Sequence, residues 1–497
     1  MSDEESARQA ITRLADRLLL RRPEMQRNHE YFRGQQPLRF ASKAFSHYFG
    51  HQYAEFADNW CEVVAVSPPE RLQWQGIRLP DAKDGKADKD TWRVWVENDA
   101  EVESGLAFLN SGIASTAFMH VWGNPDDEST PEICFEDARE AIVEYAPGSR
   151  RKRRVGLKMW ADDWGGWEFA TVEFPDYIWK YKRKAARKVP EGLQIPGNVV
   201  YGSGQWIPRD VEETGDDVWP LPNPLKKVPL VELPNRPLLA EHPLSDIGGV
   251  RAMQDAINLL WAHLFTDSDF AALPQRILLG ADVPKIPVLD DSGKQVGERK
   301  VSMEELRQRR MLWVPSKDAK VAEWSPANLD MFTGVLGIAV EHVAAQTRTP
   351  PYYLVGKMIN IGPEALKASE TGQVKKCEEK QLYYGSGIRD GQELVALAQG
   401  DDSKAKAVRS ATMLWKDAEM RSEAQLVDGI VKLRSIGFPF QWCAERYGLD
   451  PVEVSRVLGM REDEQRQAML AGLLNPPPPD ENDAPAPEQL PAAAAAE

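Results

Sequence analysis

The sequence has few cysteines and no long apolar run. Its four cysteines (Cys61, Cys134, Cys377 and Cys443) lie far apart and form no CxxC pair. This pattern predicts buried thiols rather than a disulfide framework or a zinc site. No stretch of about 18 consecutive apolar residues occurs, so no membrane-spanning helix is expected. The acidic start, Met-Ser-Asp-Glu-Glu-Ser, has no apolar core and does not predict a signal peptide.

Motifs of catalytic sites are also missing. Neither a GxxxxGK[ST] phosphate loop nor a GxSxG nucleophile elbow is present. The glycine-rich segment 385–391 has the wrong spacing for a nucleotide loop and follows no predicted strand, so a turn or helix break is the preferred interpretation. His47 and His51 could share a helical face, but without a HExxH glutamate we interpret them as ordinary packing or surface histidines. We therefore predict no catalytic residue, no cofactor and no metal, and do not expect an enzyme.

The charge balance is acidic, with 76 Asp and Glu against 61 Lys and Arg and a formal net charge of −15. Such a chain is not expected to hold nucleic acid over its whole surface, because phosphate affinity comes from lysine and arginine. Two basic runs are exceptions. They contain Arg150, Arg151, Lys152, Arg153 and Arg154 in the first, and Lys180, Lys182, Arg183 and Lys184 in the second.

The position of these runs suggests two interpretations. If the strands predicted at 155–160 and 168–181 pair as a hairpin, both runs lie near one open end and form a single basic patch that can contact phosphates. The alternative is a solvated sheet edge, where charge prevents unwanted strand pairing. The sequence leaves both open.

The first half of the chain reads as mixed helix and strand. Residues 4–32 have helical periodicity with a break expected at Pro23, and strands are expected at 118–122, 155–160, 168–174 and 177–181. The Pro- and Gly-rich stretch 189–236 predicts loops with short extended pieces. We therefore expect an α/β region over about residues 1–240.

The second half is dominated by helices. An apolar stripe predicts a helix over 246–270, and a second helix is expected from Ser325 and Pro326 to 348, where Thr349-Pro350-Pro351 stops it. The small unit 271–324 between them has extended pieces, so the two helices must run antiparallel if it projects from their shared end. A more polar helix interrupted by glycines is expected from 363 into the 380s, then further helices to about 470. The Pro-, Ala- and acid-rich tail 476–497 predicts disorder.

Four short motifs follow one another within residues 20–470. The first three are Tyr31-Phe32-Arg33-Gly34-Gln35-Gln36-Pro37-Leu38, Trp95 with Asn98, and Ala272-Leu273-Pro274-Gln275-Arg276 with Gly280. The fourth is Thr349-Pro350-Pro351-Tyr352-Tyr353-Leu354-Val355-Gly356 with Asn360 and Glu364-Ala365-Leu366-Lys367. With the order of segments, these motifs resemble the portal proteins of long-tailed phages, a family common in actinobacterial phages and prophages. One departure is Ile361-Gly362-Pro363, where the family usually has Ser-Gly.

The resemblance implies a mixed α+β, helix-rich fold with portal-type wing, stem, clip and crown. The implied segments are a wing (1–240), stem helix (241–270), clip (271–324), stem helix (325–348), tunnel loop (349–362), wing helix (363–400), helical crown (401–475) and disordered tail (476–497). The residues implied to face DNA from the tunnel loop are Tyr352, Tyr353, Leu354, Lys357, Met358, Ile359 and Asn360. Simple packing between subunits is the alternative for these side chains.

The resemblance also implies a function. Such a chain forms a homo-oligomeric ring, typically a dodecamer, at the unique capsid vertex of the virion, assembled in the bacterial host cytoplasm. Double-stranded DNA passes through the ring during packaging and ejection. The implied partners are the terminase large subunit, the head–tail adaptor, the major capsid protein and the scaffolding protein, with no membrane. The main alternative is another structural head protein, such as a minor capsid or adaptor component, and an intracellular enzyme is the third hypothesis.

Overall fold

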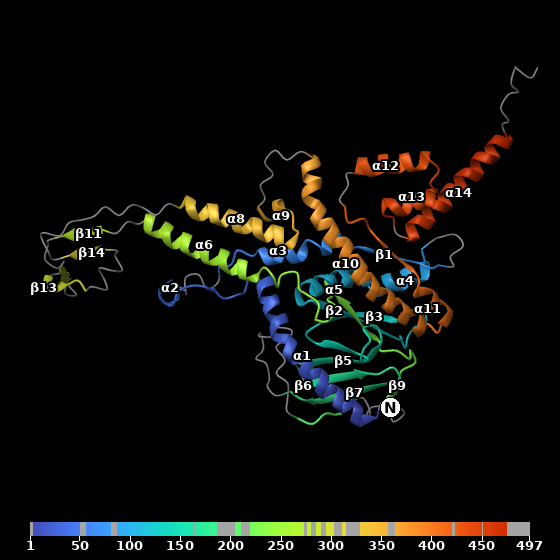
Figure 1. The fold of residues 1–497 in the computed structure, drawn as a ribbon, viewed down its shortest axis with the longest axis horizontal. Coiled ribbons are helices and arrows are strands. Elements are labelled where there is room, and N and C mark those ends of the chain that lie inside the picture. Colours follow the sequence, from blue (N-terminus) through green and yellow to red (C-terminus); the bar gives the residue numbers. More distant parts are fainter. Residues whose placement is uncertain are drawn as a thin grey trace, which may run out of the picture.

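The fold combines helices with several small sheets (Figure 1). It is seen in a computed structural model, and it confirms the expected mixed α+β class. The structure describes residues 3–49, 56–80, 87–162, 166–185, 204–209, 219–272, 276–279, 285–289, 295–302, 311–314, 329–355, 363–419, 423–449 and 451–474. The predicted tail 476–497 lies outside these residues.

An antiparallel sheet covered by the N-terminal helix forms one layer of the body. The sheet follows the chain in the order β4 (Ala141–Tyr145), β5 (Arg153–Asp162), β6 (Trp167–Glu173), β7 (Tyr177–Lys184) and β8 (Ile207–Pro208), and β9 (Leu221–Pro222) also pairs with β7. Helix α1 (Glu4–Phe32) lies against one face, where Ile11, Leu14 and Leu18 pack with Leu157 and Val172 in one buried cluster. Alternating strand residues supply this core because successive side chains point to opposite faces.

Pro23 does not break α1, contrary to the expectation from the sequence. The helix continues through it from Glu4 to Phe32. An interior proline costs about 3 kcal/mol in a helix. Both halves of α1 are fixed by packing, Leu14 in the cluster of the β4–β8 sheet and Tyr31 in the cluster that contains helix α6 (Arg251–Ala272). Tertiary burial on both sides of Pro23 therefore outweighs the local preference.

A second core surrounds a three-stranded sheet. Its order is β10 (Leu230–Pro234), β2 (Thr116–Trp122) and β3 (Glu132–Asp137), all antiparallel. Helices α5 (Ala100–Ala114) and α10 (Pro363–Ala398) contact this sheet. Next to it lie α4 (Lys89–Glu97) and the pair β1 (Trp74–Arg78) and β15 (Thr412–Trp415), and Trp74, Trp95 and Tyr384 belong to the same buried cluster. Strand β10 is one of the short extended pieces expected within the stretch 189–236.

Helix α10 is continuous, so the helix break expected at the glycine-rich segment 385–391 is wrong. The glycines allow close packing instead. A Cβ added at Gly387 would lie 2.5 Å from Leu233 Cδ2 and 2.8 Å from the Glu232 carbonyl oxygen, and one at Gly391 would lie 2.4 Å from Met119 Sδ. Because glycine lacks a side chain, the helix backbone can lie directly on strands β10 and β2.

Two long helices extend from the body side by side. Figure 1 shows α6 and α8 (Asp330–Thr347) running antiparallel, with the strands between them at their far end. Those strands are β11 (Arg276–Leu279), β12 (Lys285–Leu289), β13 (Gln295–Lys300) and β14 (Met311–Val314). Strands β11 and β14 pair in parallel, and β12 and β13 form an antiparallel pair. The antiparallel arrangement expected from the sequence is confirmed, while Ser325 and Pro326 lie outside the described residues.

The remaining elements are short, except at the C-terminus. Near the N-terminal part lie α2 (Lys43–Phe49), α3 (Trp60–Val66) and η1 (Pro69–Arg71), and after α8 comes α9 (Pro351–Val355). The C-terminal helices are α11 (Asp402–Val408), α12 (Glu423–Ser435), α13 (Phe440–Tyr447) and α14 (Pro451–Leu474). Val408, Ala411 and Ala418 belong to the buried cluster of Trp74, so residues 402–418 are part of the body. The boundary expected at residue 401 therefore does not separate two packing units.

Candidate functional site

The antiparallel pair α6 and α8 has an unusual charge pattern. Arg251, the first residue of α6, is the only lysine or arginine in the two helices, whereas Asp255, Asp267, Asp269, Asp330 and Glu341 are acidic. Ile257 of α6 and Leu336, Val340 and Val343 of α8 share one buried cluster. The hairpin is thus an apolar seam with acidic residues and almost no cation.

One face of α8 is apolar and exposed among the residues that the structure describes. Met331 is 64% exposed, Val335 45% and Ile338 57%. Their spacing of four and three residues places them on one helical face, opposite to the residues that contact α6. Exposed apolar stripes of this kind are typical of contacts with another chain.

Backbone and side-chain contacts fix the C-terminal end of α8. Arg348 caps it in the left-handed conformation with φ of 56°, and the hydroxyls of Thr347 and Thr349 lie 2.9 Å apart in a hydrogen bond. Pro350 and Pro351 then prevent the helix from continuing, since proline lacks an N–H donor. The chain turns directly into the short helix α9.

Helix α9 is attached to the body by a buried arginine. The Arg71 side chain is 2% exposed, donates from Nη2 to the Tyr353 hydroxyl at 2.7 Å and lies 3.4 Å from Glu370 Oε1. Tyr352 donates its hydroxyl to Glu370 of α10. Burial alone would lower the pKa of Arg71, but its bonds to Tyr353 and Glu370 raise it. Burial raises the pKa of Tyr352, so the hydroxyl stays protonated.

Three residues of the predicted DNA-facing loop make contacts within the chain. Tyr352 and Tyr353 are half-buried and hydrogen-bonded within the chain, and Leu354 is 4% exposed in the cluster of α6 and α8. A side chain this buried packs within the chain, whereas the DNA-facing role of Leu354 stays a prediction. Lys357, Met358, Ile359 and Asn360 lie outside the described residues.

A buried ion network joins the start of the hairpin to α10. Asp246 has a side chain 0% exposed, and its Oδ2 accepts from Lys380 Nζ at 2.7 Å while its Oδ1 lies 3.8 Å from Lys376 Nζ. Lys380 also donates to Asn235. Burial lowers the pKa of Lys376 to about 8, although Asp246 opposes the shift. Burial would raise the pKa of Asp246, but the two lysines hold it below its usual value.

The two basic runs do not form the single patch that was one of the two interpretations of the sequence. Strands β5, β6 and β7 are joined in a meander, so β7 runs parallel in direction to β5. Arg153 therefore lies at one end of the sheet, and Lys184, which pairs with Trp167 beside Asp162, lies at the other. Ten residues of β5 separate the two ends by roughly 30 Å. The hairpin assumed from the sequence treated 168–181 as one strand, which would have placed both basic runs at the same end. Because this segment forms two strands, β6 and β7, the second run lies at the opposite end.

The second run contacts its own sheet. Arg183 forms an ion pair with Glu168 at 2.6 Å and lies over the Trp206 ring, and Lys182 lies over the Trp167 ring. Lys184 at the end of the strand is exposed. Lys180 is half-buried on the same strand.

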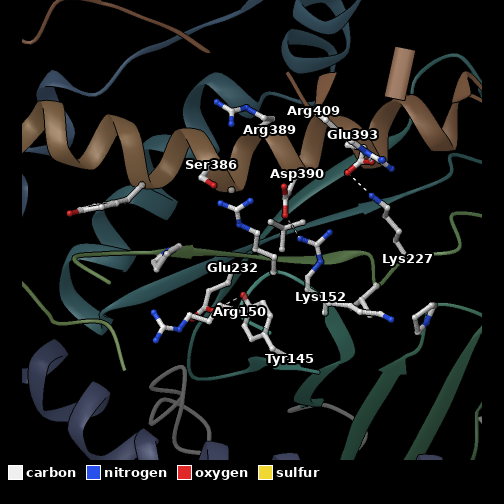
Figure 2. A pocket seen from close by; sticks show the side chains of 18 of the residues that line it. Tyr145, Arg150, Lys152, Lys227, Glu232, Ser386, Arg389, Asp390, Glu393 and Arg409 are labelled. Atoms are coloured by element: carbon white, nitrogen blue, oxygen red, sulfur yellow. Dashed lines mark hydrogen bonds and ion pairs between the residues drawn. The ribbon is translucent and has the colours of Figure 1, made fainter. Parts of the chain in front are cut away.

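The first run instead lines a cleft of about 750 Å³ between the β4–β5 turn and α10 (Figure 2). The turn contributes Arg150, Arg151, Lys152 and Arg153, and Arg154 lies just outside, 3.6 Å from Glu144. The other lining cations are Lys226, Lys227, Arg389 and Arg409, and the lining carboxylates are Glu232, Asp390 and Glu393. Lys226 and Lys227 precede β10, whereas Arg389 lies on α10 and Arg409 follows α11. We refer to this cavity below as the basic cleft.

Sequence reasoning missed half of the cleft's cations and the anchoring role of Arg71. Lys226 and Lys227 are a pair in a Pro-rich stretch, and Arg389 lies in the segment interpreted as a helix break. Nothing in their spacing links them to Arg150. Only the packing of α10 on β10 brings these residues together.

Other structural expectations have mixed outcomes. Cys61, Cys377 and Cys443 are buried free thiols as expected, whereas Cys134 is exposed. Within the described ranges, no cluster of three or more His, Cys, Asp and Glu residues could hold a metal ion. None of the helices in those ranges is long and apolar enough to cross a membrane.

The family of the chain follows from comparison with known proteins. A family model described as "Phage portal protein, SPP1 Gp6-like" matches residues 77–439, which is most of the chain. The chain therefore belongs to this phage portal family, a class of structural proteins of the virion. The long-tailed phage resemblance of the motifs is thus confirmed.

Two named relatives come from mycobacterial phages. The portal protein of Mycobacterium phage D29 is 26% identical over 419 residues, covering 82% of this chain and 78% of its own length. The portal protein of Mycobacterium phage L5 is 26% identical over 426 residues, covering 82% and 79%. A solved chain from a "Virion of native gene transfer agent (GTA) particle" covers 86% of this chain and 94% of itself, but its TM-score of 0.36 and identity of 11% are too low to support an argument.

Proposed function

We propose that this portal-family chain forms a closed ring at the unique vertex of a phage capsid and conducts double-stranded DNA during packaging and ejection. The observation that carries the proposal is the α6–α8 hairpin, which combines an exposed apolar stripe with an almost complete lack of cations. Membership in the portal family supports the same assignment. The ring is proposed to be a dodecamer, assembled in the bacterial host cytoplasm.

The proposed segments follow the architecture. The body built from residues 1–240 and 363–400 is the wing, and 241–270 with 325–348 is the stem. The strands within 271–324 are the clip, 349–362 is the tunnel loop, 401–475 is the crown, and 476–497 is a separate tail. Because 402–418 pack into the body, the proposed crown effectively begins at α12.

The charge of the hairpin suits a channel wall. Each lysine or arginine that neutralises a phosphate releases counterions and adds affinity, which resists sliding. The hairpin offers DNA only Arg251, and that side chain contacts Glu24 and Asn28 of α1. Acidic groups such as Glu341 on its exposed surface repel phosphates. A duplex can therefore pass such a wall without being trapped.

This role of charge can be tested on α8. Glu341 is exposed, so Glu341→Lys is expected to leave the chain folded and to slow packaging, most strongly at low salt, where phosphate contacts are tightest. Glu341→Gln removes the same carboxylate without adding a cation and serves as the control. Equal packaging rates for the lysine and glutamine variants over a range of salt would contradict a DNA-facing α8.

The exposed stripe of α8 is proposed to contact a neighbouring copy. Head-to-tail contacts close into rings when the rotation permits. Ile338→Asp places a charge on the stripe, where it costs the isolated chain little because the side chain is 57% exposed. We expect this variant to stay monomeric in negative-stain images at concentrations where the parent forms rings. Ile338→Val is the control and should assemble, and normal rings of the aspartate variant would refute this contact.

The clip is proposed to dock the terminase large subunit first and the head–tail adaptor afterwards. Major capsid and scaffolding proteins are the proposed partners around the vertex. A chain lacking 271–324 is expected to keep a folded body and to lose binding to both clip partners in pull-down assays. Terminase binding retained by this deletion would rule out the assignment.

The alternative is another structural head protein, such as a minor capsid or adaptor component without a channel. It would share the virion but would not form a ring around DNA. Images of the purified chain at high concentration separate the two. A chain that stays monomeric there supports the alternative.

A further inference from the structure

The basic cleft is not explained by a channel along α6 and α8. Helix α8 ends beside Gly372, whose added Cβ would lie 3.4 Å from Arg348 Cβ, and the cleft begins around Ser386 of the same helix α10. At 1.5 Å per residue, roughly 20–30 Å of α10 separates the hairpin from cleft residues 386–393. A ligand in the cleft is therefore distinct from the stretch of DNA proposed to pass the hairpin.

Part of the cleft's charge is neutralised internally. Asp390 forms an ion pair with Arg153 at 2.7 Å. Glu393 pairs with both Lys227 and Arg409 at 2.5 Å, and Glu232 accepts from the Tyr145 hydroxyl at 3.0 Å. All three lining carboxylates are thus engaged, as the dashed contacts in Figure 2 illustrate.

Within the described part of the chain, five cations of the cleft have no carboxylate partner. Arg150, Arg151, Lys152, Lys226 and Arg389 have no ion pair among the residues that the structure describes. Arg389 Nε is shielded from solvent and has no hydrogen-bond partner within that part of the chain. In a protein with a net charge of −15, such a concentration of unpaired cations stores electrostatic free energy that an anion can release.

We propose that the basic cleft binds the phosphate backbone of DNA outside the channel, an inference that rests on the proposed portal function. Three of the five unpaired cations are arginines, whose planar guanidinium donates two parallel hydrogen bonds to a phosphate. The contacts are to the backbone and carry no sequence preference. DNA packed into the head beside the ring is the source available to such a portal.

The lining favours phosphates over an acidic peptide. Peptide recognition uses pockets or grooves for apolar anchors beside the charged contacts. Val228 and Val231, which border the cleft, are each only 1% exposed and offer no apolar anchor site, whereas eight lysine and arginine side chains line it. A concentration of lysine and arginine side chains is the pattern of sequence-independent binding to a polyanion.

One backbone feature holds a cation at the rim. Lys226 adopts the left-handed region with φ of 53°, which disfavours side chains other than those of glycine, asparagine and aspartate. It follows Asn223, which anchors the turn by accepting from the Leu225 amide at 3.0 Å and donating to the Lys227 carbonyl at 2.7 Å. Lys226→Asn removes the charge while keeping a residue that this backbone tolerates.

The salt dependence of binding gives a quantitative expectation. Five cations that each neutralise one phosphate of duplex DNA give a slope of log K against log salt of about −4.5. Affinity should then fall roughly 500-fold between 50 and 200 mM salt. Removing two of these cations should make the slope less negative by about 2.

The experiment measures binding of fluorescent 20-base-pair duplexes of two unrelated sequences to the full chain by anisotropy across this salt range. The test variant is Arg150→Gln with Arg151→Gln, both exposed, and Lys226→Asn is tested separately. The matched control is Lys182→Gln with Lys184→Gln, which removes two charges at the opposite end of the same sheet. We expect both cleft variants to bind more weakly with shallower slopes, the control to match the parent, and the two sequences to bind alike.

Several results would overturn the proposal. They are no DNA binding by the parent chain at 50 mM salt, equal weakening by the cleft and control variants, or a marked preference for one sequence. Tighter cleft-dependent binding of polyglutamate than of DNA would assign the cleft to an acidic protein segment instead. Ring formation is imaged on the same samples, because rings without cleft-dependent DNA binding refute only this inference, whereas absence of rings refutes the portal function.

Discussion

The buried Asp246 should hold α10 to the start of the stem hairpin, and Asp246→Asn tests this. The substitution keeps the size of the side chain and removes its charge. Lys376 and Lys380 then stay buried, with side chains 8% and 2% exposed, without a carboxylate. Lys380 keeps its bond to Asn235, so the change removes charge pairing rather than packing.

The magnitude can be worked from the two distances. At an effective dielectric constant near 20, the attraction of Asp246 is about 6 kcal/mol for Lys380 at 2.7 Å and about 4 kcal/mol for Lys376 at 3.8 Å. Part of this is offset in the native protein by the cost of burying the charges. Breaking a buried pair by removing one partner typically lowers the free energy of unfolding by about 3–5 kcal/mol. The whole free energy of unfolding of a typical domain is only about 5–15 kcal/mol.

The destabilisation caused by Asp246→Asn should depend on pH in a defined direction. The pKa of Lys376 is lowered to about 8, so its protonated form destabilises the fold below that pH and the penalty disappears as pH rises towards 10.5. The pKa of Lys380 is raised, so its pairing is stabilising up to 10.5 and lost above it. Without Asp246 the pKa of both lysines should be lowered. The loss in free energy of unfolding of Asp246→Asn relative to the parent, called the deficit below, is then largest near pH 7 and shrinks towards pH 10.

Chemical denaturation of the parent and the variant at pH 7, 8.5 and 10 measures this deficit. Glu379→Gln is the control, because it makes the same change one residue before Lys380 at a carboxylate 48% exposed, where an ion pair contributes about 1 kcal/mol or less. An Asp246→Asn deficit at pH 7 no larger than that of the control would refute the reasoning. So would a large deficit that is independent of pH, since packing alone would explain it.

Three further predictions concern stability. Gly387→Ala should lower the free energy of unfolding by about 1–3 kcal/mol because its Cβ would overlap β10. Gly459→Ala in α14, where an added Cβ has nothing within 4 Å, should raise the free energy of unfolding by up to about 1 kcal/mol. Equal effects of the two variants in a denaturant titration would contradict this prediction. Tyr353→Phe should cost about 1–3 kcal/mol by removing the acceptor of buried Arg71 and should expose α9 to proteolysis, so unchanged proteolysis would count against the anchor. Burial lowers the pKa of His29 to about 4, so up to about 3 kcal/mol should be lost as pH falls from 6.5 through 4, and His29→Gln should reduce that loss.

Much of the helical framework was predictable because it depends on local signals. The apolar periodicity of 246–270 and the Thr349-Pro350-Pro351 stop located the paired helices to within a few residues. The strand patterns at 155–160 and 168–174 were equally clear. Each signal lies within one element, where spacing alone determines which face is apolar.

The wrong predictions concern elements whose structure depends on contacts with distant segments of the chain. Pro23 was expected to break one helix, and the glycines near 387 to break another, but both helices are continuous because they pack against distant segments. Strand β10 is one of the short extended pieces expected within 189–236, but its pairing with β2 could not be predicted because the partner strand lies far away in the sequence. Propensity is a weak prior when burial opposes it.

The sequence by itself determined the family resemblance, the paired helices and the scarcity of cations in them, because motif spacing and charge are properties of the chain. Tertiary structure alone decided that Leu354 is a packing residue, that the two basic runs lie at opposite ends of one sheet, and that Arg150 shares a cleft with Arg389. Contacts between residues more than 200 positions apart depend on strand order and helix packing. Those in turn follow from how the whole chain buries its apolar surface.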